Sequence, residues 1–340
     1  MYYIRPKLKK NTMQAFEKLR ADYLAYATQQ HFQSYQPREL YEPLDYILSL
    51  GGKQMRPILL LSAARLFDEN VVGISLPAAY AIELFHNFSL IHDDIMDNAA
   101  VRRGKATVHE KYGNSTAILS GDVMLVYAYQ YLAALKTEKL QQILQIFNET
   151  AIGVCEGQQM DMNFEKLEQV SVGSYIRMIE LKTSVLLYGA MKIGALMAKA
   201  SENDAENIAA FGRNMGIAFQ LQDDYLDSFG DEKTFGKRIG GDIVQNKKTY
   251  LYIKALAQAP EIDRKKIFDW YNNDVQASDE NRKIEEVKSI FMSSGAVDAL
   301  EREIENYKNK ALSAMSNINA DKVKKQELID FLHFIMQRQN

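Results

Sequence analysis

Two acidic clusters with the same spacing stand out in the sequence. One reads DDIMD over residues 93–97 and the other reads DDYLD over residues 223–227. On an α-helix, positions i, i+1 and i+4 project within an arc of about 100°. Carboxylates gathered in this way repel one another by roughly 2–3 kcal/mol per pair at an effective dielectric constant of about 20. Each cluster therefore needs cations, and its hard oxygen ligands favour Mg²⁺ that bridges to a phosphate.

Residues that precede each cluster extend the same helical face. His86 lies two turns before Asp93, about 20° away around the helix, and Ser89 lies one turn before it. Gln220, one turn before Asp224, shares an arc of about 100° with the acids of the second cluster. One such cluster could be an ordinary solvated helix face. Two copies, each after a largely apolar helix, favour a functional site, and the glycine and closing glutamate of an EF-hand loop are missing.

The segment GGKQMRP over residues 51–57 predicts an anion site. Its glycines free the backbone, and Pro57 fits only near the start of a helix, where backbone N–H groups lack partners. Lys53 and Arg56 would share a face of that first turn. A helix N-terminus with two cations on one face binds anions. The alternative is an ordinary turn with two surface cations.

Basic side chains follow both acidic clusters. Arg102 and Arg103 lie in the loop of residues 98–108, where they would either bind phosphate bidentately or simply neutralise the nearby acids. Residues 230–248 carry four glycines and five Lys or Arg side chains. This segment suits either a lid over phosphates or a solvated loop. Lys182 would be either a surface cation or a phosphate ligand, because a buried lysine is costly without a partner.

Helices are expected to position these segments. Glycine and proline are few, with 18 and 6 residues in 340, and apolar residues recur at helical spacing nearly throughout. No run alternates apolar and polar residues over the length of a strand. We expect a single all-α domain over residues 1–340, with a core of about 40–258 and C-terminal helices in 260–340. The expected helices lie near residues 10–34, 39–49, 54–67, 76–98, 115–134, 137–162, 171–198, 201–229, 247–258, 262–272, 280–293, 297–316 and 322–338.

Composition excludes several classes of function. The net charge of −3 gives no basic footprint for nucleic acid. The single cysteine, Cys155, cannot form an internal disulfide and indicates a reducing compartment, so we expect a cytoplasmic protein. The N-terminus shows no apolar signal-peptide region. We expect no integral membrane segment, because even the most apolar stretch, residues 184–198, is interrupted by Lys192.

A series of ordered motifs makes the chain resemble the trans-isoprenyl diphosphate synthases, or polyprenyl synthetases. The resemblance runs from about residue 40 to 255 and more loosely to the C-terminus. The matching segments are GGKQMRP at 51–57, FHNFSLIHDDIMD at 85–97, VRRGKATVH at 101–109, GDVML at 121–125, GQQMD at 157–161, ELKTS at 180–184, FQLQDDYLD at 219–227 and FGKRIGGD at 235–242. The resemblance implies a bundle of antiparallel helices around a deep central cavity, usually in a homodimer. It also implies a prenyltransferase that joins isopentenyl diphosphate head to tail to a dimethylallyl, geranyl or farnesyl diphosphate.

The resemblance also implies roles for individual residues, and three Mg²⁺ ions per active site with substrate bound. The chief Mg²⁺ ligands would be Asp93, Asp97 and Asp223, supported by Asp94, Asp224 and Asp227. The diphosphate of isopentenyl diphosphate would be bound by Gly52, Lys53, Arg56, His86 and Arg103. The allylic diphosphate and the cationic centre beside it would be bound by Arg102, Lys182, Thr183, Gln220, Lys237 and Lys247.

One position departs from the family pattern. The family often has Gly-Lys where this chain has Asn246 followed by Lys247. Asparagine also tolerates a left-handed backbone. We therefore expect Lys247 still to reach the site.

The helix that carries the first cluster is expected to set the length of the product. Phe88 precedes Asp93 by five residues, about 7.5 Å of helical rise, while Ser89 is small and lies on the face of Asp93. Aromatic side chains here act as a cavity floor in the family, and Phe85 is the next candidate. We expect a short all-trans product, with C20 as the first expectation and C15 as the second.

Two other functions compete with this interpretation. A class I terpene cyclase also uses an aspartate-rich helix and Mg²⁺, but its second metal motif usually mixes Asn/Asp, Ser/Thr and Glu. It would also need no isopentenyl diphosphate site at Lys53, Arg56 and Arg103. A non-catalytic subunit of a heteromeric prenyl synthase is the other alternative. Such subunits tend to lose an acidic cluster, and both clusters are whole here.

Overall fold

The computed structural model describes residues 10–230, 239–272 and 276–336, and it confirms the expected all-α fold. The elements are α1 (Lys10–Ala27), α2 (Arg38–Ser49), α3 (Met55–Phe67), the 3₁₀ turn η1 (Glu69–Val71), α4 (Val72–Met96), β1 (Val101–Arg102), β2 (Lys105–Ala106), α5 (Val108–Tyr112), α6 (Asn114–Ala133), α7 (Leu140–Lys166), α8 (Val172–Ile179), the π-helix η2 (Glu180–Ser184), α9 (Val185–Met197), α10 (Glu202–Phe229), α12 (Gly241–Val244), α13 (Tyr250–Gln258), α14 (Glu261–Asn272), the 3₁₀ turn η3 (Ala277–Asp279), α15 (Glu280–Ser293), α16 (Ala296–Ser316) and α17 (Lys322–Met336).

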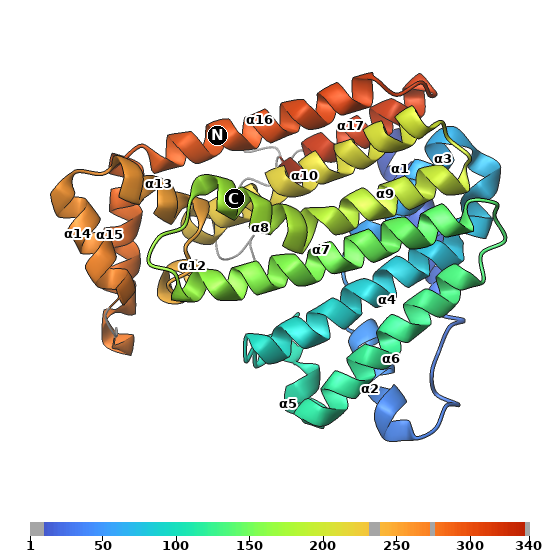
Figure 1. Cartoon of the computed structure of the whole chain (residues 1–340), viewed down its shortest axis with the longest axis horizontal. Coiled ribbons are helices and arrows are strands. Elements are labelled where there is room, and N and C mark those ends of the chain that lie inside the picture. Colours follow the sequence, from blue (N-terminus) through green and yellow to red (C-terminus); the bar gives the residue numbers. More distant parts are fainter. Residues whose placement is uncertain (1–9, 231–238, 273–275, 337–340) are drawn as a thin grey trace.

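Long helices form the body of the molecule. From top to bottom in Figure 1 they follow the order α16, α10, α9, α7, α4 and α6. Helix α10 packs on α16 and α9, α9 packs on α7 and α4, and α6 packs on α4 and α7. The short helices α13, α14 and α15 gather at one end. The acidic clusters lie at the C-terminal ends of α4 and α10. Two long helices thus deliver the two clusters.

Two hydrophobic cores support the two halves of the fold. The larger core lies among α1 to α7, α9 and the first half of α10, and α17 closes it. The smaller core joins the second half of α10 to α8, α12 to α15 and the start of α16. The first acidic cluster therefore belongs to a helix of the larger core. The second cluster follows Ile217 and Leu221, which belong to the smaller one.

Helix α4 is the most apolar long helix. Together with η1 it is long and apolar enough to cross a membrane by length and composition, but 56% of its most apolar window is buried inside the fold. It packs against α3, α6 and α9. We therefore treat it as a core helix.

Several expected boundaries differ from the observed ones. Helix α1 ends at Ala27 rather than at residue 34, and α4 begins at Val72 rather than at 76. The predicted loop 98–108 contains a short antiparallel hairpin that pairs Val101 with Ala106. The expected helix 171–198 includes the π-helical turn η2. The single-domain organisation stays a prediction.

Candidate active site

The first acidic cluster is met by cations from the hairpin that follows it. Asp94 is only 1% exposed and accepts two hydrogen bonds from Arg102, from Nε and Nη2 at 2.7 Å each. Arg102 Nη2 also lies 3.6 Å from Asp93 Oδ2. Burial alone would lower the pKa of Arg102, but the hydrogen bonds and charge of Asp94 raise it above its ordinary value. Arg102 therefore neutralises acids, as one reading of the sequence predicted, and remains one-quarter exposed.

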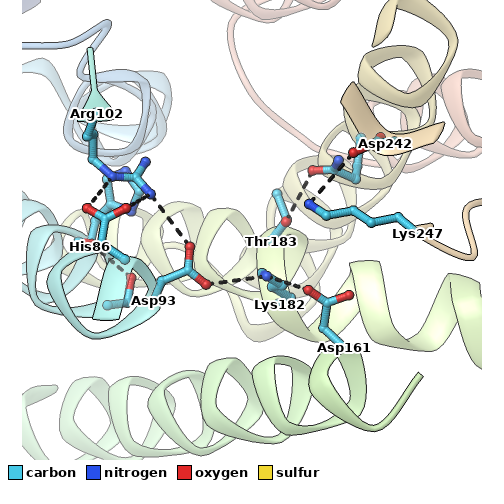
Figure 2. A network of polar contacts seen from close by, with 11 residues as sticks. His86, Asp93, Arg102, Asp161, Lys182, Thr183, Asp242 and Lys247 are labelled. Atoms are coloured by element: carbon cyan, nitrogen blue, oxygen red, sulfur yellow. Dashed lines mark hydrogen bonds and ion pairs between the residues drawn. The ribbon is translucent and has the colours of Figure 1, made fainter. Parts of the chain in front are cut away.

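Asp93 stands in the middle of a chain of charges. Its Oδ1 lies 3.3 Å from Lys182 Nζ, which donates a hydrogen bond of 2.6 Å to Asp161 Oδ2. Figure 2 shows Arg102, Asp93, Lys182 and Asp161 in one row. The row connects β1, α4, η2 and α7. Sequence reasoning assigned no role to Asp161, although it ends the matched segment GQQMD.

The π-helical turn η2 aims two predicted side chains into this site. π-Helical turns occur mostly as bulges within α-helices and often at functional sites. Helix α7 packs directly on the turn, because a Cβ atom at Gly157 would lie 2.2 Å from the Lys182 backbone nitrogen. Thr183 Oγ1 donates a hydrogen bond of 3.3 Å to Gln220 Oε1 on α10. Lys182, Thr183 and Gln220 are thereby brought together, as predicted.

The second acidic cluster has a different setting. Asp224 and Asp227 are buried, at 4% and 9% exposure, whereas Asp223 is partly exposed. Asp224 accepts a hydrogen bond from the Tyr175 hydroxyl, and burial raises the pKa of Asp224 well above its ordinary value. Asp227 Oδ2 accepts a hydrogen bond from the backbone nitrogen of Asp242, 3.0 Å away. These acids share one arc on the helical wheel, but their burial and their hydrogen-bond partners differ in the structure.

Residues 239–249 lead back towards the two clusters. Asn246 adopts the left-handed backbone that its sequence position suggested, with φ of 57°. Lys247 Nζ lies 3.7 Å from Asp242 Oδ1, and Figure 2 shows the Lys247 side chain pointing towards that of Thr183. Burial would lower the pKa of Lys247, but the charges of Asp242, Asp161 and Asp97 raise it. The predicted ligand Lys237 lies outside the described residues.

The predicted isopentenyl diphosphate residues lie together, with one difference. Gln54 is left-handed, with φ of 49°, and α3 begins only at Met55. Lys53 therefore precedes the helix, and the expectation that it shares the first helical turn with Arg56 was wrong. The backbone at Gly52 lies against Arg103, because a Cβ atom there would be 2.9 Å from Arg103 Nη2. Only glycine allows this approach without displacing the guanidinium.

A histidine and a glutamate complete this basic group. His86 Nε2 lies 3.0 Å from Arg56 Nη1. Burial and the charges of Arg56 and Arg103 lower the pKa of His86 well below its ordinary value, so the ring is neutral at pH 7 and Nε2 can accept. Glu83, one turn earlier on α4, is buried; burial raises its pKa, whereas the charges of Arg56 and Arg103 lower it. Sequence reasoning missed Glu83, whose signal was its place three residues before His86.

Aromatic rings lie beneath the first cluster. The Phe88 ring centroid is 4.7 Å from that of His92 and 5.5 Å from that of Phe85. Phe85 also meets Phe147 of α7 at 5.3 Å, edge to face. Ser89, which is partly buried, donates a hydrogen bond to the His86 carbonyl. The predicted chain-length residues therefore form one group on α4.

The arrangement of carboxylates fits Mg²⁺ shared with a substrate. Across residues 10–230, 239–272 and 276–336, no three Asp, Glu, His or Cys side chains converge into a ready-made metal site. The buried Asp93 Oδ1 has an ion pair but no hydrogen-bond partner. Mg²⁺ often binds through one or two carboxylates while waters and phosphate oxygens complete its shell. Separated carboxylates are therefore compatible with a Mg²⁺–diphosphate complex.

Comparisons with known proteins agree with this geometry. Residues 37–289 match the polyprenyl synthetase family. A geranylgeranyl diphosphate synthase of Methanosarcina mazei is 42% identical over 229 residues, covering 67% of this chain and 70% of that protein. A geranylfarnesyl diphosphate synthase of Aeropyrum pernix is 35% identical over 314 residues, covering 90% and 96%.

Solved structures share the whole architecture. A crystal structure of a geranylgeranyl pyrophosphate synthase superposes with a TM-score of 0.87 at 41% identity. The superposition covers 98% of this chain and 100% of that one. The chain belongs to the polyprenyl synthetase family and is a prenyltransferase of the isoprenyl diphosphate synthase type.

Proposed function

We propose that the chain condenses isopentenyl diphosphate with an allylic diphosphate to give a short all-trans prenyl diphosphate and pyrophosphate. The observation that supports this most directly is the separation of cations into two groups. Arg56 and Arg103 lie with His86, whereas Lys182 and Lys247 lie beyond Asp93 (Figure 2). A reaction between two diphosphates needs one site for the group that stays and one for the group that leaves.

The group around Arg56 would hold isopentenyl diphosphate. Burial lowers the pKa of Arg56 to about 10, so its guanidinium remains charged at neutral pH. The neutral His86 ring lies against it, and Arg103 stands over Gly52. Lys53 would reach the same diphosphate from the exposed segment before α3. This group fixes the alkene without taking part in bond cleavage.

The group around Lys182 would stabilise the leaving diphosphate. When the bond between the allylic carbon and oxygen breaks, both electrons stay on the oxygen and negative charge grows there. Neighbouring acids raise the pKa of Lys182 and of Lys247 against the effect of burial, so both ammonium groups stay charged. Fixed cations stabilise such developing charge. Arg102 and Lys237 would assist.

The organic cation would lie beside oxygen dipoles. Thr183 Oγ1 and Gln220 Oε1 are joined by a hydrogen bond next to Lys182. The alkene of isopentenyl diphosphate attacks the allylic carbon, and the resulting cation loses a proton to the departing pyrophosphate. No protein base is needed. Exclusion of water by the surrounding apolar helices prevents capture of the cation.

The family uses Mg²⁺. When bound, Mg²⁺ would neutralise the leaving diphosphate as its charge grows. We assign Asp93, Asp97 and Asp223 as its chief ligands and three ions to each site. The supporting acids Asp94, Asp224 and Asp227 already accept hydrogen bonds from the protein.

We propose C20 as the main product, with C15 second. The Phe88 and Phe85 rings pack at a tilt beneath the first cluster, where a growing chain would end. The names of two relatives correspond to C20 and C25 products. A C25 product is therefore the alternative that the relatives favour.

Product sizing tests the proposal. The enzyme is incubated with Mg²⁺, labelled isopentenyl diphosphate and dimethylallyl, geranyl or farnesyl diphosphate in turn, and the dephosphorylated products are sized. We expect mainly C20, and mainly C30 or longer would overturn the proposed length. Pyrophosphate release that needs both substrates is expected. Release from an allylic diphosphate alone, with a hydrocarbon product, would indicate a cyclase, and no turnover would indicate a non-catalytic subunit.

We also propose a cytoplasmic homodimer. Apolar side chains recur along one exposed stripe of α6, at Ile118, Leu119, Val126 and Tyr129. A second copy would bury this stripe, because exposed apolar stripes mark interaction surfaces. Sedimentation equilibrium should give twice the chain mass. A monomeric mass at micromolar concentration would contradict the dimer.

A further inference from the structure

Residues 239–249, which carry Lys247, rest on a C-terminal helix. Helix α12 packs between α10 and α15. Gly240 has φ of 80°, and a Cβ atom there would lie 2.8 Å from the Ile284 side chain. Ile243 and Ile284 belong to the same small core. The backbone before Lys247 is therefore held against α15.

A buried lysine on α15 makes a specific contact with this segment. Lys283 is 1% exposed, and its ammonium group donates a hydrogen bond to Asn246 Oδ1. The same Nζ lies 5.1 Å from the centroid of the Tyr271 ring on α14. A buried ammonium group costs free energy unless it has polar or aromatic partners. Asn246 supplies a side-chain acceptor at a position where a glycine would supply none.

The contact lies directly beside the backbone that aims Lys247. Asn246 has φ of 57°, a conformation that costs free energy for a residue with a side chain. The next backbone N–H, that of Lys247, donates to the Asp242 carbonyl at 2.9 Å. Lys247 Nζ lies 3.7 Å from the Asp242 carboxylate. A turn fixed at Asn246 thus sets where the Lys247 side chain leaves the backbone.

We propose that Lys283 is a positioning residue for Lys247. By holding the Asn246 side chain, it keeps the left-handed turn in place and presents Lys247 to the leaving diphosphate. This gives helix α15 a role in the site although none of the residues that we assign to the substrates lies on it. The inference rests on the proposed role of Lys247. A lysine that merely fills space in the core would support the fold without affecting one substrate more than the other.

A double-mutant cycle tests the coupling. Lys283→Met removes the ammonium group and keeps an unbranched apolar side chain, and Asn246→Gly keeps the left-handed turn without its anchor. Steady-state kinetics would give kcat and the KM of each substrate, and inorganic pyrophosphate would serve as a competing probe. We expect Lys283→Met to raise the KM of the allylic diphosphate and the inhibition constant of pyrophosphate about three- to tenfold. The KM of isopentenyl diphosphate should change less than about twofold.

The glycine background provides the critical comparison. In the Asn246→Gly enzyme, Lys283→Met should change the allylic KM by less than about twofold, because the anchored side chain is already gone. Asn246→Gly alone should lower the melting temperature more than the double variant does, because it leaves the Lys283 ammonium buried without this acceptor. Equal effects of Lys283→Met in both backgrounds would overturn the proposal. Equal rises in both substrate KM values would do the same.

Two further variants separate the inference from its premise. Lys247→Met should raise the allylic KM, and no change would overturn the proposed role of Lys247 itself. A rise with Lys247→Met but none with Lys283→Met would overturn only the positioning role. Lys266→Met on α14 is the matched control, because Lys266 is 55% exposed and forms an ion pair with Asp263, three residues earlier on the same helix. It should leave both KM values unchanged.

Discussion

The two acidic clusters have the same spacing but different partners. At the end of α4, Asp94 pairs with the Arg102 guanidinium and Asp93 with the Lys182 ammonium. At the end of α10, the buried Asp224 accepts a hydrogen bond from a tyrosine hydroxyl, and the buried Asp227 accepts one from a backbone N–H. In the first cluster Asp93 and Asp94 thus meet cations, whereas in the second the buried Asp224 accepts a hydrogen bond from a neutral hydroxyl.

This difference shows that identical motifs can have unequal roles. Asp94 accepts charge-assisted hydrogen bonds from the Arg102 guanidinium, and such bonds are stronger than those from neutral donors. A buried carboxyl that meets only neutral donors is easier to protonate, which agrees with the raised pKa of Asp224. We therefore expect the first cluster to depend on charge and the buried part of the second to depend on hydrogen bonding.

Breaking the cation contact of the first cluster should have the largest effect on stability. Arg102→Gln leaves Asp94 buried without its guanidinium and should lower the free energy of unfolding by about 3–5 kcal/mol. Tyr175→Phe removes a neutral donor from Asp224 and should cost about 1–3 kcal/mol. Denaturant unfolding of both variants would measure the difference. Equal losses would contradict the distinction between the clusters.

Removing charge should also affect the clusters unequally in catalysis. Asp93→Asn keeps the shape but removes a charge from the row that leads to Lys182, so kcat/KM should fall about 10²–10³-fold. Asp224→Asn should cost at least tenfold less, because its amide oxygen can still accept from Tyr175. Mg²⁺-dependent pyrophosphate release would measure both variants. A larger loss for Asp224→Asn would reverse the proposed order.

The aromatic floor belongs to the first cluster alone in our proposal. Phe88→Ala should lengthen the product, because it removes the ring that lies between His92 and Phe85. Sizing of dephosphorylated products would show the shift. Phe16→Ala is the matched control, because Phe16 stacks on Phe331 at 4.7 Å within the contacts of α1 and α17. An unchanged distribution in Phe88→Ala would place the floor elsewhere, first at Phe85.

The basic group beside the first cluster should give a small, pH-dependent effect. The folded protein holds the pKa of His86 well below the ordinary 6.5, so below pH 6.5 the unfolded chain binds a proton that the folded protein does not. The contribution of His86 to the free energy of unfolding is therefore fully present above pH 6.5. It is lost as the pH falls from 6.5 towards the folded pKa, by about 1.4 kcal/mol per pH unit. His86→Gln removes this dependence. Denaturant unfolding at pH 7.5 and 5.5 should thus show that His86→Gln loses less free energy of unfolding between the two pH values than the unaltered protein does. Equal losses in the two proteins would contradict the low pKa of His86.

Much of the site could be predicted from short, ordered motifs. The spacing in DDIMD and DDYLD indicated two cation-dependent faces, and the structure brings Lys182, Thr183 and Gln220 together as expected. Residues outside the strongest motifs were missed. Glu83 faces Arg56 and Arg103, and Asp161 pairs with Lys182. The periodicity of one helix does not show which side chains of other elements lie opposite it.

The C-terminal helices show that helical periodicity does not predict contacts between distant helices. Their charges read as solvated helical faces, yet Lys283 is buried against Asn246, 37 residues earlier in the chain. A helical wheel gives the direction of a side chain around its own axis. It does not tell which helix lies opposite.

The sequence by itself determined the all-α class, the family and the groups that we propose to bind Mg²⁺ and diphosphate, because these depend on residue type and local spacing. Only the tertiary structure decided which acids are paired with cations, which are buried beside neutral donors, and that α15 holds the turn before Lys247. Burial and charge pairing depend on contacts between helices that are distant in sequence. The same D-D-x-x-D spacing therefore has one electrostatic meaning on α4 and another on α10.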